Sequence, residues 1–83
     1  MTLQIKLFAV AMQKAGSAVL EVECPLPATV DDVRQAVLAT CPALAEVLPH
    51  CRFALNDEFA QDNARVDADS VVAIIPPVSG GAS

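Results

Sequence analysis

Hydrophobic and polar residues alternate along the first quarter of the chain. Leu3, Ile5 and Leu7 are separated by polar side chains, which is the period of two of a half-buried strand. A turn over residues 14–17 follows, and a second alternating run then places four residues on one face: Ala18, Leu20, Val22 and Cys24. Two such runs with a short connection predict an antiparallel hairpin. It ends before Pro25, because proline donates no hydrogen bond to a ladder.

The pattern changes to the period of a helix after residue 29. One face of this segment is apolar and consists of Val30, Val33, Val37 and Cys41. Thr29 is the expected N-cap, and Asp32 completes an imperfect capping box with aspartate in place of the usual glutamate or glutamine. The sequence therefore predicts a helix that begins after Thr29 and ends before Pro42, with a further helical turn within residues 43–48.

Strand patterns return in the second half of the chain. Large apolar side chains alternate with smaller or polar ones over residues 52–56, and residues 59–60 fit a second, short strand. Residues 56–58 and 67–70 are typical of turns. Residues 71–75 are apolar and mostly β-branched, which is typical of a strand covered on both faces. The order β-β-α-β-β-β predicts an α+β domain in which one main helix packs across a mixed sheet.

Composition and charge argue against several classes of function. The 83 residues carry ten acidic and five scattered basic side chains, a net charge of −5, which disfavours nucleic acid as a partner. The longest apolar run is far shorter than the ~20 residues of a membrane span. The first residues show no signal-peptide pattern. We therefore expect a cytoplasmic protein that does not contact a membrane.

The chain offers little side-chain chemistry. Cys24, Cys41 and Cys51 are widely spaced and form no C-x-x-C pair, as expected in a reducing compartment, and are interpreted as small apolar residues. His50 is the single histidine, and neighbouring chain positions rarely supply the geometry of a Cys-His nucleophile pair or a metal site. We expect no catalytic group, no bound cofactor and no metal.

The last eight residues, 76–83, contain no charged side chain. Two prolines favour a stiff extended stem, and Gly80 and Gly81 make its tip narrow. We predict a domain over residues 1–75 and a flexible tail over residues 76–83 that enters a channel in another protein. The competing interpretation is an ordinary frayed end, because chain termini are commonly small and polar.

The segment from Val72 to Gly81 reads Val-Ala-Ile-Ile-Pro-Pro-Val-Ser-Gly-Gly, and it resembles the C-terminus of the small, sulfur-carrying subunit of molybdopterin synthase (MoaD type). Residues 5–9, 29–30, 54–58 and 67–69 agree with that family as well. The resemblance extends over essentially the whole chain. It implies the ubiquitin-like β-grasp fold that this family shares with the ThiS-type carriers of thiazole synthesis.

The resemblance implies a carrier that has no activity alone but is a subunit of the synthase. An E1-like adenylyltransferase (MoeB type) would use ATP to activate the C-terminal glycine, since a carboxylate is anionic at pH 7 and a poor electrophile. Sulfur would then displace AMP to give a thiocarboxylate. Inside the large subunit (MoaE type), with which a heterotetramer is expected, this group would donate sulfur to a cyclic pyranopterin precursor of the molybdenum cofactor. The resemblance thus implies that Gly81 bears the sulfur and that Gly80 is the adjacent residue without a side chain.

The chain departs from the family at its end. Family members stop at the second glycine, whereas this sequence continues with Ala82 and Ser83, and a carboxylate on Ser83 cannot do the chemistry of Gly81. Three explanations stay open: a processing peptidase removes the pair, the pair is a remnant of cloning, or the protein is an inactive paralogue.

The resemblance also implies which residues contact the large subunit. These are Phe8, Phe59 and Ile75, followed by the tail residues Pro76, Pro77 and Val78. Phe8 is the strongest candidate for an exposed position, because its parity is opposite to that of the apolar residues before it. The competing interpretation for each apolar residue is a place in the core.

Two other functions stay open. One is a sulfur carrier for another pathway, such as that of thiazole and thiamine or of cysteine, although ThiS-type chains are shorter and lack the Pro-Pro-Val stem. The other is a ubiquitin-like interaction module that never bears sulfur.

Overall fold

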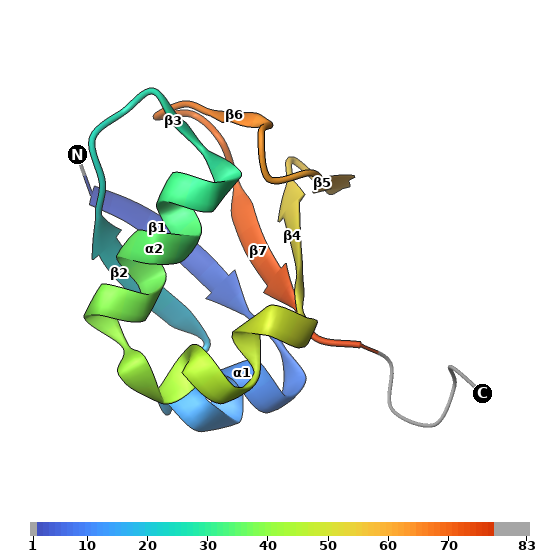
Figure 1. Cartoon of the computed structure of the whole chain (residues 1–83). Coiled ribbons are helices and arrows are strands. Elements are labelled where there is room, and N and C mark those ends of the chain that lie inside the picture. Colours follow the sequence, from blue (N-terminus) through green and yellow to red (C-terminus); the bar gives the residue numbers. More distant parts are fainter. Residues whose placement is uncertain (1, 78–83) are drawn as a thin grey trace.

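A five-stranded mixed sheet forms the centre of the computed structural model, which describes residues 2–77 (Figure 1). In spatial order its strands are β2 (Val19–Glu23), β1 (Thr2–Leu7), β7 (Val72–Ile75), β4 (Arg52–Leu55) and β5 (Glu58–Ala60). β1 and β7 run parallel, and the other neighbouring pairs are antiparallel. The predicted antiparallel pairing of the first two strands is confirmed as the β1–β2 pair, although their connection is longer than expected, and the α+β architecture with a mixed sheet is confirmed as well.

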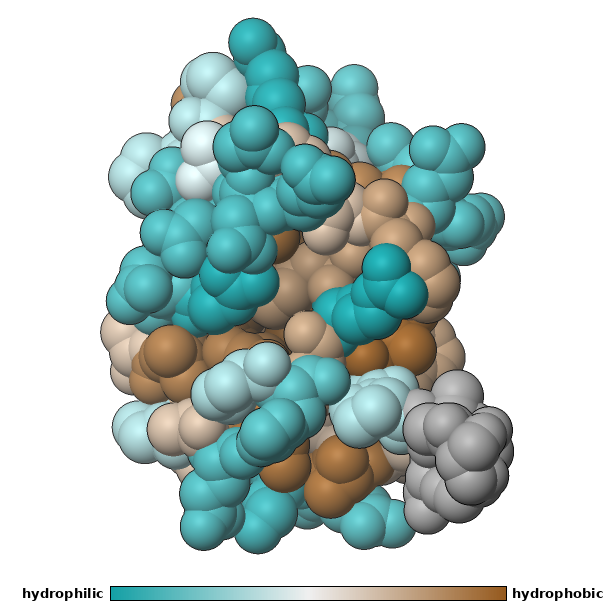
Figure 2. Space-filling model, turned by 45° about the vertical axis from the view of Figure 1, so that its right-hand side comes forward, coloured by the Kyte–Doolittle hydropathy of each residue, from teal (hydrophilic) through white to brown (hydrophobic). Residues whose placement is uncertain are grey.

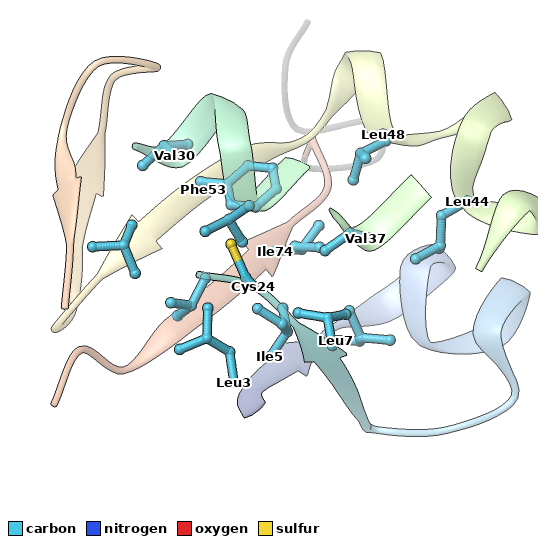
Figure 3. Close-up of a cluster of buried hydrophobic side chains, with 14 of the residues drawn as sticks. Leu3, Ile5, Leu7, Cys24, Val30, Val37, Leu44, Leu48, Phe53 and Ile74 are labelled. Atoms are coloured by element: carbon cyan, nitrogen blue, oxygen red, sulfur yellow. The ribbon is translucent and has the colours of Figure 1, made fainter. Parts of the chain in front are cut away.

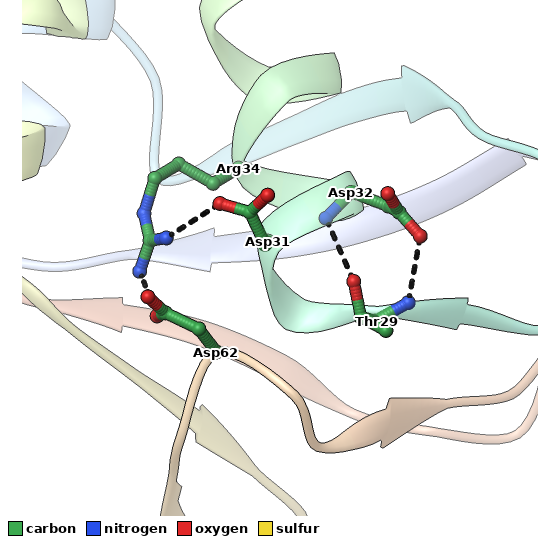
Figure 4. Close-up of polar contacts among 5 residues, drawn as sticks. All are labelled: Thr29, Asp31, Asp32, Arg34 and Asp62. Atoms are coloured by element: carbon green, nitrogen blue, oxygen red, sulfur yellow. Dashed lines mark hydrogen bonds and ion pairs between the residues drawn. The ribbon is translucent and has the colours of Figure 1, made fainter.

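Helix α2 (Val30–Thr40) crosses one face of the sheet, as the sequence predicts (Figure 1). The Asp32 backbone N–H donates to Thr29 Oγ1 at 3.1 Å, and the Thr29 backbone N–H donates to Asp32 Oδ2 at 3.0 Å (Figure 4). The capping box is therefore complete, because the short aspartate side chain still reaches the backbone of the N-cap. It fixes where the helix begins, next to the sheet.

The core lies between α2 and the inner face of the sheet (Figure 3). The alternating residues of β1 point into it, and the apolar face of α2 packs against them. The largest fully buried side chains include Ile5, Val30, Val33, Val37, Phe53, Val72 and Ile74. Burial of each such side chain stabilises the fold by about 1.5–3 kcal/mol relative to an exposed position.

A second helix, α1 (Ala9–Ala15), lies between β1 and β2, where the sequence predicted only a turn. The expectation of a single main helix was therefore incomplete. The helix ends at Gly16, which has φ 76° and donates its backbone N–H to Met12 O at 2.9 Å. Glycine adopts this left-handed geometry without steric cost, so it closes the helix at the predicted turn.

Short elements complete the fold. The 3₁₀ helices η1 (Pro42–Glu46) and η2 (Leu48–His50) extend the chain after α2, and η1 overlaps residues 43–48, where the sequence predicted a further helical turn. Strands β3 (Ala28–Thr29) and β6 (Arg65–Val66) form a separate two-stranded sheet. No helix within residues 2–77 is long and apolar enough to cross a membrane.

β7 is covered on one face only, which corrects the expectation that both faces of residues 71–75 are buried. Val72 and Ile74 point into the core, whereas Ala73 and Ile75 are half-buried on the opposite face and Val71 is exposed. The reason lies in the architecture: α2 covers the inner face of the sheet, whereas α1 lies at the end of β1 and β2 (Figure 1). The apolar residues of β7 are therefore not all core residues, and the outer face becomes the candidate site.

Candidate docking face and C-terminal segment

β7 lies at the centre of the sheet, between β1 and β4, and leads directly into Pro76 and Pro77. Hydrogen bonding to two neighbouring strands anchors the point from which the C-terminal segment leaves the domain. Val78, Gly80, Gly81, Ala82 and Ser83 lie outside the described residues. The predicted division at residue 75 and the predicted roles of Gly80 and Gly81 therefore stay predictions.

One row of side chains runs across the outer face of all five strands. The pairing register places Val19 opposite Lys6, Lys6 beside Ala73, Ala73 opposite Ala54, and Ala54 opposite Phe59. Residues that are paired in this way share one face of the sheet. The two central positions are alanines, and a lysine and a phenylalanine flank them. The centre of the row is consequently lower than its sides.

A hollow of about 210 Å³ lies over these two alanines. Its apolar lining consists of Phe8, Ala54, Phe59, Val71, Ala73 and Ile75, which we call the outer-face patch. Lys6 and Asp57 also line the hollow. Exposed apolar residues occur on another side of the molecule as well, between hydrophilic ones (Figure 2). Exposure alone therefore does not single out a candidate docking site, whereas a hollow with an apolar floor does.

Phe8 is 47% exposed, which confirms the outward position that its parity predicts. It ends the extended segment of β1 with φ −129° and ψ 150°, and Ala9 then takes a φ of 53° that turns the chain into α1. The turn leaves the Phe8 ring on the outer side of the sheet, next to the end of β7. Its contact with a partner stays a prediction.

Phe59 is 56% exposed on the edge strand β5. The guanidinium carbon of Arg52 lies 3.9 Å from the centroid of its ring. Arg52 is diagonal to Phe59 across the β4–β5 pair, so the cation stacks on the ring without entering the core. This stacking holds an exposed aromatic side chain in one orientation.

The other predicted contact residues differ in exposure. Ile75 is half-buried and pairs with Arg52, Pro76 is buried, and Pro77 is exposed. Ile75 thus presents surface beside Phe8 and Phe59, Pro77 is accessible after it, and Pro76 presents little surface. The structure brings Phe8, Phe59 and Ile75 together around one hollow.

Sequence reasoning missed three groups at this face: Ala54, Ala73 and the Arg52–Phe59 pair. Ala54 is only 4% exposed although it points away from the core, because its larger neighbours cover it. The two alanines and Arg52 carry no motif, and only the pairing of distant strands makes them neighbours. The alternation of residues 52–56 was the one usable signal, since it separates Ala54 from Phe53 and Leu55.

The cysteines lie away from this face and do not form a reactive site. Burial raises the pKa of the Cys24 thiol, and the negative charge of Asp32 raises it further. Burial also raises the pKa of the Cys51 thiol. Protonated thiols are poor nucleophiles and poor metal ligands. Within residues 2–77 no group of three or more His, Cys, Asp or Glu side chains is arranged to hold a metal ion.

The chain is similar to proteins named as sulfur carriers and as a small archaeal modifier. The model of the ThiS family matches residues 5–81. A molybdopterin synthase sulfur carrier subunit from Chlamydomonas reinhardtii is 36% identical over 83 residues, which cover 98% of this chain and 100% of the relative.

Solved structures agree on the β-grasp fold. The crystal structure of SAMP1 from Haloferax volcanii matches with a TM-score of 0.85 and 32% identity over 98% of this chain and 100% of that chain. A chain in a protein–protein complex of subunits 1 and 2 of the molybdopterin-converting factor from Helicobacter pylori matches with a TM-score of 0.68 at 24% identity, with 98% of this chain and 100% of that chain covered. This last likeness concerns the fold alone.

Proposed function

The chain belongs to the ThiS family, and from this premise we propose that it is the sulfur carrier subunit of a molybdopterin synthase. The observation that carries the proposal is the 36% identity, over nearly the full length of both chains, to a relative with that name. The family match also ends at residue 81, which is the residue that the proposed chemistry requires.

The proposed reaction begins at the carboxylate of Gly81. A peptidase first hydrolyses the Gly81–Ala82 bond, which consumes one water and releases the dipeptide. The carboxylate oxygen then attacks the α-phosphate of ATP on an E1-like enzyme, so that an acyl-adenylate forms and pyrophosphate leaves. Hydrosulfide attacks the carbonyl carbon and AMP leaves with the electron pair of the broken C–O bond. The product is a thiocarboxylate. Its sulfur attacks a carbon of the pyranopterin precursor and displaces an oxygen leaving group, and water then hydrolyses the resulting acyl–sulfur bond, so that the sulfur stays on the precursor and Gly81 returns to a carboxylate.

In this scheme the chain's own residues position the C-terminal acyl group relative to the large subunit. β7 is held on both sides by hydrogen bonds, so the start of the tail is fixed relative to the outer-face patch. Docking of the patch on the large subunit would bring the tail to one place on that partner, which reduces the entropy lost in positioning the acyl group. Glycine at the terminus leaves the carbonyl unhindered because it has no Cβ.

The experiment is an intact-mass measurement on a chain that ends at Gly81. It is incubated with a MoeB-type adenylyltransferase, ATP and sodium sulfide, and we expect a gain of about 16 Da, since one oxygen is replaced by sulfur. The matched control is the chain that ends at Ser83, which should gain no mass under the same conditions. An unchanged mass of the chain that ends at Gly81 would contradict the proposal and favour an interaction module.

A second candidate function is that of a protein modifier, and it is favoured by the likeness to SAMP1 of Haloferax volcanii, the small archaeal modifier protein 1. In that case an amine of another protein attacks the same acyl-adenylate, AMP leaves and an amide forms. The same incubation distinguishes the two functions when a lysine-rich protein extract replaces sulfide. A modifier becomes covalently attached to larger proteins in bonds that survive thiols, whereas a dedicated sulfur carrier does not.

A further inference from the structure

We propose that the hollow on the outer face receives an apolar side chain of the synthase large subunit, and that this side chain is flanked by carboxylates that face Lys6 and Arg52. The inference rests on the proposed function, because it describes the chemistry of the surface on the partner that the carrier requires. It adds two features to the aromatic contacts already described. One is the floor of the hollow, formed by Ala54 and Ala73, and the other is a charged rim, formed by Lys6 and Arg52.

The shape of the hollow follows from residue size. Ala73 and Ala54 are paired across β7 and β4, and their neighbours in the same row are Lys6 and Phe59. Phe8 and Ile75 close the side next to the tail. A hollow of about 210 Å³ with an apolar floor matches one or two apolar side chains better than a flat contact.

The charged rim follows from a comparison of all five cationic side chains. Lys14 pairs with Glu46 at 3.0 Å, Arg34 pairs with Asp31 and Asp62, and Arg65 pairs with Asp67 at 2.8 Å. Within residues 2–77, Lys6 and Arg52 are the cations that form no ion pair. Both lie on the outer face, although the protein has twice as many acidic as basic side chains.

The position of these cations specifies where the partner is acidic. Arg52 pairs with Ile75, the last residue of β7, and Lys6 pairs with Ala73, so both lie beside the strand that leads into the tail. The one carboxylate that lines the hollow, Asp57, belongs to the turn between β4 and β5. We therefore expect carboxylates on the partner near the entry point of the tail. Such complementarity acts mainly on the association rate and on the choice of partner.

Charge-neutralised variants test the rim. The probe is the purified large subunit from the same organism, and association rates are measured by stopped flow or surface plasmon resonance between about 20 mM and about 500 mM NaCl. We expect Lys6→Gln and Arg52→Gln each to reduce the association rate about 3–10-fold at low salt and to flatten its salt dependence. Lys14→Gln changes the net charge equally but lies on α1, and it should behave as the wild type.

Arg52→Lys separates charge from stacking. The lysine keeps the positive charge but loses the planar group that covers the Phe59 ring. We expect it to retain most of the salt dependence that Arg52→Gln loses. If Arg52→Lys and Arg52→Gln lose salt dependence equally, Arg52 acts through Phe59 alone and the charged rim is wrong.

Ala73→Leu tests the hollow. The larger side chain fills the space over the sheet without entering the core, and we expect the affinity for the large subunit to fall at least tenfold, with an unchanged unfolding midpoint in urea. Ala39→Leu is the control, because residue 39 is an exposed position of α2, which stands on the inner side of the sheet. Affinity of Ala73→Leu equal to that of this control would overturn the proposal.

The outcomes separate this inference from the proposed function. If the wild type binds the large subunit and gains sulfur at Gly81, but the charge variants or Ala73→Leu match their controls, the inference is wrong and the proposed function stands. If the wild type does not bind the large subunit and gains no sulfur, the proposed function fails and this inference fails with it.

Discussion

Asn56 and Val71 exchange two hydrogen bonds: the Asn56 backbone N–H donates to Val71 O at 2.9 Å, and the Val71 backbone N–H donates to Asn56 Oδ1 at 2.9 Å. Asn56 begins the two-residue turn between β4 and β5, in which Asn56 and Asp57 both have positive φ, 53° and 72°. The turn therefore fixes the position of Val71, which lines the hollow and directly precedes β7. One side chain fixes a hairpin and the strand that leads to the tail.

Substitution of Asn56 should separate these contributions. Asn56→Gly keeps the positive φ and the backbone bond to Val71 O but loses the bond that Val71 N–H donates to Asn56 Oδ1, and we expect a loss of about 1 kcal/mol in the free energy of unfolding. Asn56→Ala adds the cost of a left-handed alanine, for a total of about 2 kcal/mol. Urea unfolding measures both. Equal losses for the two variants would contradict the role of the backbone conformation.

Loss of an aromatic ring from the outer-face patch should weaken docking without unfolding the protein. Phe8→Asp removes an exposed ring, so we expect a change in stability within about 1 kcal/mol but a loss of affinity for the large subunit of at least tenfold. Met12→Asp is the control, because Met12 is also exposed but lies on α1 and does not line the hollow. Titration calorimetry and urea unfolding provide the two readouts. An unchanged affinity would remove Phe8 from the docking face.

Much of the fold could be predicted from the sequence because its signals are local. The spacing of Val30, Val33 and Val37 and the Thr29 cap define α2, and the alternation of Leu3 and Ile5 defines β1. Helix α1 could not be found in this way. It is seven residues long, Ala11 is its one buried residue, and its N-cap, Phe8, makes no side-chain hydrogen bond.

The candidate site was predictable only in part, because its centre depends on long-range pairing. The parity of Phe8 indicated an exposed ring, and the resemblance supplied Phe59 and Ile75. The hollow, however, exists because Ala73 of β7 lies beside Ala54 of β4, and no local pattern specifies the register between these strands. The same pairing places Arg52 beside the end of β7.

The Arg34–Asp62 ion pair should make stability depend on acid pH. Asp62 Oδ1 accepts a hydrogen bond from Arg34 at 2.7 Å (Figure 4), and this bond holds the pKa of the Asp62 carboxyl below its ordinary value of 3.8. A carboxyl with a lowered pKa in the folded state stabilises that state above its ordinary pKa, and the contribution is lost as the pH falls through the lower value.

Asp62→Asn tests this linkage. At pH 7 the variant should be less stable than the wild type, and the difference should shrink as the pH falls below about 3.8. Urea unfolding at several pH values measures it, and NMR titration of the Asp62 carboxyl gives the direction of its pKa directly. Asp69→Asn, an exposed residue in the turn before β7, is the charge-matched control. A difference that is constant from pH 7 to the acid limit would contradict the ion pair as its cause.

The cysteines provide the last test, because a sulfur carrier can in principle hold sulfur on a thiol instead of a terminal acyl group. A persulfide needs a thiolate, whereas burial raises the pKa of both Cys24 and Cys51. We therefore expect a variant with Cys24→Ala, Cys41→Ser and Cys51→Ala, in a chain that ends at Gly81, to gain the same mass as the parent chain.

The size of the mass gain identifies the atom that carries the sulfur. Replacement of oxygen at the glycyl carboxylate adds about 16 Da, whereas a persulfide on cysteine adds about 32 Da. A persulfide forms from a thiolate and a sulfane sulfur without a further oxidant, so the incubation is repeated with sodium polysulfide in place of sodium sulfide. If the parent chain gains only about 32 Da with polysulfide and the variant without cysteines gains nothing with either donor, the sulfur is on a thiol and Gly81 is not the acceptor. If both gain about 16 Da, the cysteines are apolar packing residues, as the burial of Cys24 indicates.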